Sequence, residues 1–173
     1  MTSDTRPATE IAGGAFRFVP HRCFACGELN EHGLHLELHT DAGGCRTDLT
    51  LDPRFQGWEG VAHGGILCTI LDEVMAWSVI GRGTWGVTAR MAVDFRRPVP
   101  VGRAIRAEGE VDRSSRRLFR TVGRILDDET GEILATAEGT YVAAPPDRLA
   151  ELQARYRVRP VDGQADPPDM VDA

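Results

Sequence analysis

Hydrophobic and polar positions alternate in the first third of the chain. Three leucines, Leu34, Leu36 and Leu38, are separated by single polar residues, and the alternation resumes at Leu49 and Leu51 after the turn residues 41–44. A period of two is typical of a strand with one buried face. The pattern therefore predicts a hairpin of two strands here.

A long apolar run without proline follows at residues 66–80. Its apolar residues include Leu67, Ile70, Leu71 and Val74, which recur at spacings of three and four residues. This period is typical of a helix, and the glycines at positions 81 and 83 provide a stop. The chain after residue 52 thus predicts an irregular stretch and then one long, mostly buried helix.

Four further segments have strand character, at 87–97, 103–112, 117–127 and 133–143, and turn residues bound each of them. Strands, one long apolar helix and then more strands form an α+β pattern, in which an antiparallel sheet wraps a single buried helix. We expect a folded domain at 21–145 and a short C-terminal helix at 146–157. The polar ends, 1–20 and 158–173, are expected to be a flexible and a disordered tail.

Composition narrows the classes of function. A chain of 173 residues suits one domain, and its net charge of -6 comes without a basic stripe, which argues against a nucleic-acid partner. No segment approaches the roughly 20 apolar residues of a membrane span, and residues 1–10 lack the apolar part of a signal peptide. The expectation is a cytoplasmic protein without a membrane partner.

Two of the four cysteines, Cys23 and Cys26, have the spacing of a motif. A structural zinc site needs four ligands, so this pair would require Cys45 with a histidine such as His21, or a second pair from another subunit. A redox motif would open a helix, whereas turn residues follow here. We therefore expect a tight loop with reduced thiols, no metal and no cofactor.

The start of the predicted helix carries the first candidate chemistry. Gly64 and Gly65 leave backbone N–H groups open at the positive end of the helix dipole, where a developing oxyanion can bind. The alternative is that the two glycines only permit a tight turn.

A carboxylate inside the apolar helix is the second candidate. Burying Asp72 costs several kcal/mol unless it is paired or functional, and small residues one turn away on either side leave room beside it. The alternative, a partly exposed helix acid, applies better to Glu73.

Helix geometry links the two candidates. Positions 64 and 72 lie about 12 Å apart along a helix that rises about 1.5 Å per residue. A reacting carbonyl must lie roughly 3 Å from both groups, which one helix cannot arrange. Two antiparallel helices in a symmetric homodimer can, because each brings its start beside the middle of the other and creates shared active sites.

These residues together resemble a known family. The segments 63–65 (HGG), Asp72, 86–88 (GVT), 94–98 (DFRRP) and the opening 23–27 (CFACG) are similar to hotdog-fold acyl-CoA thioesterases of the phenylacetyl-CoA, or PaaI, type, from about residue 23 to 142. The resemblance implies a curved antiparallel sheet around a central helix, in a dimer or a dimer of dimers. It also implies hydrolysis of an acyl-CoA substrate to a carboxylic acid and free coenzyme A.

The resemblance assigns roles to four residues. Asp72 matches the catalytic carboxylate, which activates water or attacks the thioester directly. Gly64 matches the backbone donor that polarises the thioester carbonyl, and His63 matches the histidine that orients this loop and helps bind the carbonyl. Thr88 matches a hydroxyl that places the attacking water, although strand propensity alone would also explain a threonine there.

Substrate-binding candidates are less specific. Many relatives carry an asparagine with an auxiliary polar role where this chain has Gly57. Gln56 could take over that role, or it could be an ordinary solvated loop residue. Gly65 would contact substrate beside Gly64. Arginines suit coenzyme A phosphates, or are solvated strand-end charges, and the candidates are Arg96, Arg97, Arg113, Arg116 and Arg117, of which the last three match the family's nucleotide-contacting turn.

Two other functions fit the same fold. A non-catalytic acyl-CoA-binding or regulatory module would have no need of Asp72. Hydration of an enoyl-CoA would require an aspartate and histidine pair in a hydratase-type segment, which the sequence lacks.

Overall fold

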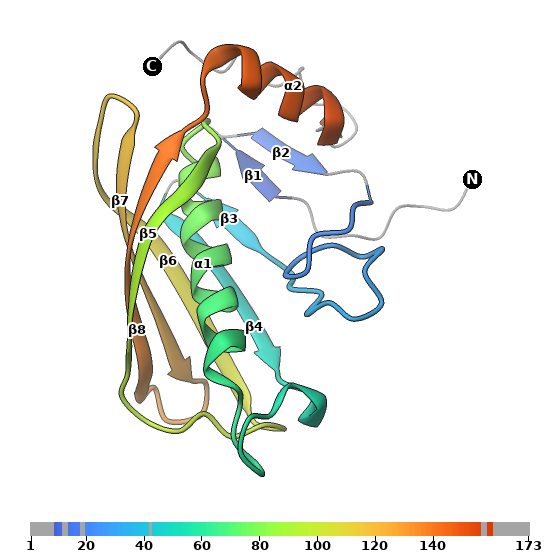
Figure 1. Ribbon diagram of the computed structural model, residues 1–173, viewed down its shortest axis with the longest axis vertical. Coiled ribbons are helices and arrows are strands. Elements are labelled where there is room, and N and C mark those ends of the chain that lie inside the picture. The colour runs from blue at the N-terminus through green and yellow to red at the C-terminus, as the bar shows by residue number, and fades with distance from the viewer. Residues whose placement is uncertain (1–8, 12–13, 18–19, 42, 157–158, 161–173) are drawn as a thin grey trace.

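The computed structural model describes residues 9–11, 14–17, 20–41, 43–156 and 159–160. Its main feature in these residues is a six-stranded antiparallel sheet that curves around one long helix, α1 (Gly64–Ile80) (Figure 1). The strands are β3 (His39–Asp41), β4 (Gly44–Thr50), β5 (Gly86–Phe95), β6 (Ala104–Ser115), β7 (Leu118–Asp127) and β8 (Ile133–Ala143). The predicted α+β fold is confirmed.

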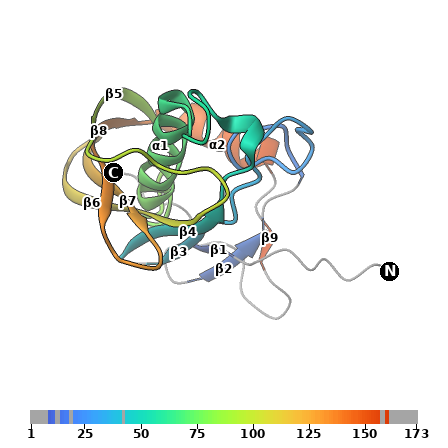
Figure 2. The ribbon, with the colours of Figure 1, turned by 90° about the horizontal axis from the view of Figure 1, so that it is seen from below.

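The strand order is β3-β4-β6-β7-β8-β5. The strand that follows α1 in the chain therefore lies at the opposite edge of the sheet from β3, and the view along the helix shows the sheet curling around α1 (Figure 2). Within the described residues β5 pairs only with β8, so a ten-residue strand forms an open edge. A long edge of this kind is a template for pairing with another strand.

α1 is buried on most of its surface. The buried side chains are Leu67, Ile70, Leu71, Val74, Met75, Trp77, Ser78 and Val79. The helix ends as predicted at Gly81, whose N–H donates to the Trp77 carbonyl at 2.8 Å. A short 3-10 turn, η1 (Pro53–Phe55), begins the irregular segment that leads into it.

Small residues let α1 approach the sheet closely. Gly109 of β6 pairs with Gly123 of β7, which in turn pairs with Ala137 of β8. A Cβ atom on Gly109 would lie 2.5 Å from the Val74 carbonyl oxygen, and one on Gly123 would lie 3.1 Å from Cγ of Met75. The backbone of the helix thus rests on the sheet at Gly109, and the Met75 side chain packs over Gly123, which fixes the height and rotation of α1.

The predicted first strand is shorter than the alternation of leucines indicates. Leu36 and Leu38 are buried, but the N–H of Leu34 donates to Phe24 and that of Leu36 to Ala25, both at 2.9 Å. These amides bond the loop that carries the cysteines instead of β4. Only 39–41 therefore pair with β4, as β3.

Short elements occupy parts of the expected terminal segments. β1 (Thr9–Ile11), β2 (Gly14–Arg17) and β9 (Arg159–Pro160) form a separate small sheet, and the rest of 1–19 and 158–173 lies outside the described residues. α2 (Pro146–Tyr156) follows β8, and the Tyr156 ring contacts those of His21 and Trp85. No helix in the described part of the chain has the length and apolar character that crossing a membrane requires.

The contact at Gly109 leads to a stability prediction. Gly109→Ala should lower the free energy of unfolding by about 3 kcal/mol, because the added methyl group pushes the backbone of α1 off the sheet. Urea denaturation measures the change. Glu110→Ala, on the exposed opposite face of the same strand, is the matched control and should stay within about 0.5 kcal/mol of the original chain. Equal effects of the two substitutions would contradict the close contact.

Candidate active site

Asp72 lies at the centre of a hydrogen-bonded group that joins three elements. Its Oδ1 accepts a bond of 2.8 Å from the Thr88 hydroxyl on β5 and one of 2.7 Å from the Tyr141 hydroxyl on β8. Tyr141 is fully buried and also lies 3.0 Å from the Asp72 carbonyl oxygen, while Thr88 is exposed. The carboxylate is therefore held rigidly and remains reachable from the edge of the sheet.

Strand pairing explains why the two hydroxyls meet. Thr88 and Tyr141 are direct partners in the β5–β8 ladder, so their side chains lie side by side on one face. The register shifts just after Thr88, and such irregularities are frequent beside active sites because they re-aim a side chain. The pair faces α1 at the level of Asp72.

Tyr141 acts as a donor toward Asp72. Burial, followed by the negative charge of Asp72, raises the pKa of Tyr141 well above its usual range, so the phenol stays protonated. Tyr141 is not evident as a site residue from the sequence, because it lies 69 residues beyond Asp72 and looks like an ordinary strand residue.

His63 caps the start of α1. Its Nδ1 accepts from the Gly65 N–H at 3.0 Å, and its backbone is extended, as at a helix N-cap. The neutral ring then carries its proton on Nε2. The Gly64 N–H is the first of the helix and has no intrahelical partner, so it remains available at the positive end of the helix dipole.

The loop before α1 has little free space. A Cβ atom on Gly57 would lie 3.2 Å from both Cα and Cδ2 of His63, so an asparagine at position 57 would press on the histidine. Gln56 holds the same loop, because its Oε1 accepts from the Gly60 N–H at 3.1 Å. Gly57 therefore fits beside His63 where a larger residue would not, and the side-chain amide of Gln56 is already hydrogen-bonded within the loop.

Glu73, the next residue, faces another part of the structure. Its Oε1 accepts from Nε1 of Trp77 at 2.9 Å, and the sulfur of Cys23 lies 4.0 Å from the same oxygen. Burial raises the pKa of Glu73 to about 7. Glu73 therefore belongs to the side of α1 that the cysteine loop covers, away from Thr88 and Tyr141.

Comparisons with known proteins agree with this geometry. Residues 59–134, which include the start of α1, Asp72 and Thr88, match the family model described as thioesterase superfamily. The sheet and helix around them form the hotdog fold that the resemblance implies.

Individual relatives are similar over parts of their length. The acyl-coenzyme A thioesterase THEM4 of Bos taurus is 29% identical over 100 residues, which are 56% of this chain and 39% of that protein. This chain therefore spans about two fifths of the length of the curated relative it matches.

Solved structures share the fold. A thioesterase superfamily protein matches with a TM-score of 0.66 and 26% identity, over 70% of this chain and 60% of that one. The PaaI protein of E. coli matches with a TM-score of 0.56 and 20% identity, over 59% and 77%. A hypothetical thioesterase of Streptococcus pneumoniae TIGR4, solved with coenzyme A, gives 0.59 and 22%, over 62% and 84%.

The candidate arginines differ in their contacts. Arg97 pairs with Glu132 at 3.0 Å, Arg113 with Asp112 at 2.9 Å, and Arg96 lies 3.9 Å from Asp94. Arg117 donates to the Ala143 carbonyl at 2.7 Å, which anchors the β6–β7 turn beside the end of β8. Arg116 is exposed at that turn with a φ of 49°, and no hydrogen bond or ion pair ties it to the described residues.

A hollow of about 670 Å³ lies elsewhere, over the outer face of the sheet, and its lining includes Glu108, Arg124 and Glu138. Asp72 and Thr88 do not line it. The candidate site therefore lies at Asp72, where the hydroxyls of Thr88 and Tyr141 converge on one carboxylate oxygen.

The Asp72–Tyr141 bond predicts energetic coupling. In a double-mutant cycle with Tyr141→Phe and Asp72→Ala, measured by denaturation, the two changes should be non-additive by about 1.5–3 kcal/mol, as for a hydrogen bond to a charged group. Leu118→Ala, an exposed residue of β7, is the comparison partner for Asp72→Ala and should give additive changes. Additivity in both cycles would show that the bond does not form in solution.

Proposed function

We propose that this chain hydrolyses acyl-CoA thioesters to a carboxylic acid and free coenzyme A, with residues 21–145 as the catalytic domain. The observation that carries the proposal is the Asp72 carboxylate, held by Thr88 and Tyr141 inside a thioesterase-superfamily domain. The similarity to the THEM4 thioesterase and the coenzyme A in one structural neighbour support the substrate class.

The hydrogen bonds of Asp72 suggest how the carboxylate acts. Both hydroxyls donate to Oδ1, which leaves Oδ2 to work on the thioester. As a general base, Oδ2 removes a proton from water while the water oxygen attacks the carbonyl carbon. The tetrahedral intermediate then expels the coenzyme A thiolate, which takes up that proton. In the covalent alternative, Oδ2 itself attacks and water hydrolyses the resulting anhydride.

The backbone at the start of α1 supplies the oxyanion donor in this proposal. The Gly64 N–H lies at the positive end of the helix dipole, and the His63 cap fixes the direction of the first turn. Gly65 lines the same turn, and Gln56 holds the loop that carries His63. Thr88 orients the attacking water beside Asp72.

The site requires a second chain. Gly64 and Asp72 are separated by about 12 Å along one helix, too far to act on one carbonyl. The open edge of β5 offers the means of association, because two such edges can pair antiparallel and bring the α1 helices side by side. Val87 and Phe95 on this strand are 65% and 54% exposed, which is unusual for large apolar residues in a lone chain. We therefore propose a homodimer, alone or as a dimer of dimers, with shared sites.

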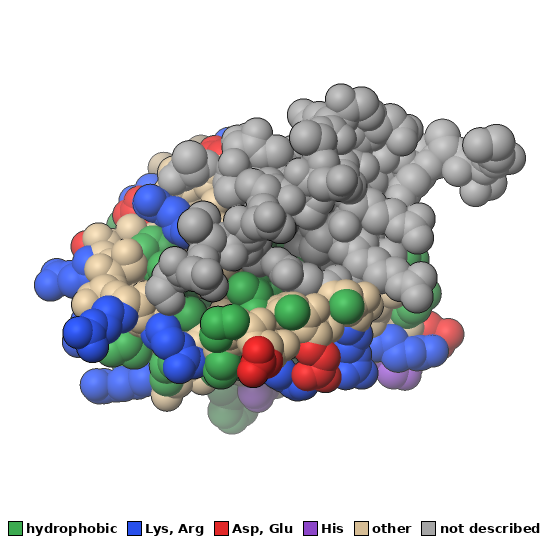
Figure 3. Space-filling model, turned by 90° about the horizontal axis from the view of Figure 1, so that it is seen from above, with side chains coloured by type: hydrophobic (Ala, Val, Ile, Leu, Met, Phe, Trp, Pro, Cys, Tyr) green, Lys and Arg blue, Asp and Glu red, His purple; other side chains and the backbone are tan. Residues whose placement is uncertain are grey.

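Arginines at the β6–β7 turn suit the nucleotide part of coenzyme A. The turn ends beside Ala143, two residues beyond Tyr141, so it lies at the Asp72 end of the sheet. Figure 3 shows this end of the molecule, where basic side chains gather along one rim of the described surface. Arg116 is the best-placed phosphate ligand of the candidates, because the others already bond to neighbouring groups.

The role of Asp72 predicts a selective loss of activity. Asp72→Ala should lower kcat/KM at least about a hundredfold on a panel of aryl and alkyl acyl-CoA substrates, because it removes the catalytic carboxylate. Release of free thiol measures the rate. Glu37→Ala removes an exposed carboxylate outside the site and should leave turnover unchanged.

Thiol release by the original chain also separates the proposal from a non-catalytic acyl-CoA-binding module, which would bind the panel without turnover. Undiminished turnover in Asp72→Ala would remove Asp72 from the mechanism.

The shared site predicts complementation between two inactive subunits. Gly64→Pro removes the backbone donor, yet suits the first helical position and the extended backbone of His63 before it. When this variant is co-refolded with Asp72→Ala, one site of the mixed dimer inherits both defects and the other inherits neither. Activity should recover to about half per heterodimer.

Refolding each variant alone provides the control and should restore nothing. A verified heterodimer without activity, or a fully active monomer, would show that each site is assembled within a single chain.

A further inference from the structure

The loop at Cys23–Gly27 has a fixed, tight backbone. The N–H of Gly27 donates to the Cys23 carbonyl at 3.0 Å, and a Cβ atom on Gly27 would lie only 2.3 Å from the Cys23 nitrogen. The carbonyls of Phe24 and Ala25 accept from Leu34 and Leu36, which tie the loop to the rest of the domain. Only glycine fits at position 27, and the two cysteine side chains are presented by a rigid turn.

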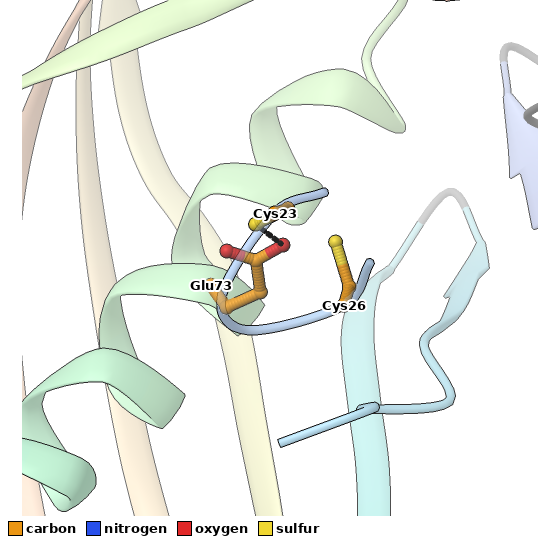
Figure 4. A group of neighbouring side chains, drawn as sticks. All are labelled: Cys23, Cys26 and Glu73. Atoms are coloured by element: carbon orange, nitrogen blue, oxygen red, sulfur yellow. Dashed lines mark hydrogen bonds between the residues drawn. The ribbon is translucent and has the colours of Figure 1, made fainter. Parts of the chain in front are cut away.

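Both cysteines face the same carboxylate. Figure 4 shows Cys23 and Cys26 on the loop with Glu73 of α1 beside them. One ligand atom from each of the three residues lies within 4.8 Å of the others, and all three side chains are partly buried. Residues 50 positions apart in the chain thus converge on one point outside the Asp72 site.

The spacing suits a tetrahedral metal ion. Zinc–sulfur bonds of about 2.3 Å and zinc–oxygen bonds of about 2.0–2.2 Å place neighbouring ligand atoms roughly 3.5–3.8 Å apart. The Cys23 sulfur and Glu73 Oε1 are already 4.0 Å apart, so small side-chain rotations suffice. Trp77 donates to Glu73 Oε1, and hydrogen bonds of this kind orient a ligating carboxylate.

We propose that Cys23, Cys26 and Glu73 bind a zinc ion, with water or a fourth group completing the tetrahedron. Thiolates favour borderline-soft divalent ions of this kind over magnesium or calcium. Each cysteine gives its proton to solvent when it binds as a thiolate. The third ligand is Glu73 of α1, and neither Cys45 nor His21 belongs to the cluster. Nδ1 of His21 already accepts a hydrogen bond from the Cys23 N–H at 3.3 Å. The expectation of a metal-free loop would then be wrong.

A metal at this point would join the N-terminal loop to the helix that carries Asp72. Glu73 faces the cysteines while Asp72 faces β5 and β8, so the ion would not contact the reacting thioester. Its role would be structural, because it fixes the loop against α1. Zinc that binds only the folded chain raises the midpoint of thermal unfolding.

The test uses the full chain, reduced, stripped with a chelator and titrated anaerobically with Co²⁺. One equivalent per chain should give a near-ultraviolet sulfur-to-cobalt charge-transfer band and the visible bands of tetrahedral cobalt, and Zn²⁺ should displace the cobalt and raise Tm. Cys26→Ser should weaken binding more than about 100-fold, beyond the loss for an outer-shell contact. Glu73→Gln should keep the charge-transfer band, but with weaker binding and altered visible bands.

Cys68→Ser is the matched control, since Cys68 lies on α1 outside the cluster, and it should titrate like the original chain. Circular dichroism verifies that each variant is folded. Absence of the charge-transfer band in the reduced original chain would overturn the proposal. It would do so even if the two cysteines form a disulfide in air. Equal cobalt affinity in Cys26→Ser would overturn it as well. None of these measurements involves a thioester, so they stand apart from the proposed hydrolysis.

Discussion

The close contact between α1 and the sheet is the constraint on which the rest of the structure depends. Gly109 leaves no side chain between β6 and the helix, so the backbone at Val74 lies almost directly on this strand, while Gly123 leaves room on β7 for the Met75 side chain. Asp72 is two residues before this contact, so it has little freedom to rise from the sheet or to turn. A rigid scaffold of this kind positions a reactive group more accurately than a loop can.

The hydrogen-bond partners of Asp72 come from two strands that follow α1 in the sequence, β5 and β8. β5 and β8 are adjacent, and their register places Thr88 opposite Tyr141. Because Asp72 is held at a fixed height, the two hydroxyls reach a single oxygen, Oδ1. A carboxylate that would be costly to bury alone is thus stabilised without a positively charged partner in this group, which leaves its charge available for chemistry.

Sequence patterns predicted the elements well, because α1 and the four later strands have clear periods and turn residues at their ends. The alternating leucines at 34–38 predicted a longer first strand than the structure has. Their side chains do alternate in burial, but the backbone amides of Leu34 and Leu36 donate to the cysteine loop and not to a neighbouring strand. Tyr141 and the setting of Glu73 were not predictable, because both depend on contacts between segments 50 to 69 residues apart. Local periodicity gives no information on such pairings.

The two neighbouring carboxylates of α1 show how one helix can separate two environments. Successive residues of a helix point about 100° apart, so Asp72 faces β5 and β8 while Glu73 faces the cysteine loop. Asp72 meets two hydroxyl donors at an open edge, whereas Glu73 meets an indole N–H and sulfur under a covering loop. The pKa of Glu73 near 7 follows from that burial, and its carboxylate cannot reach Thr88 without turning the helix. The contact of α1 with Gly109 prevents that rotation, so the two acids cannot exchange roles.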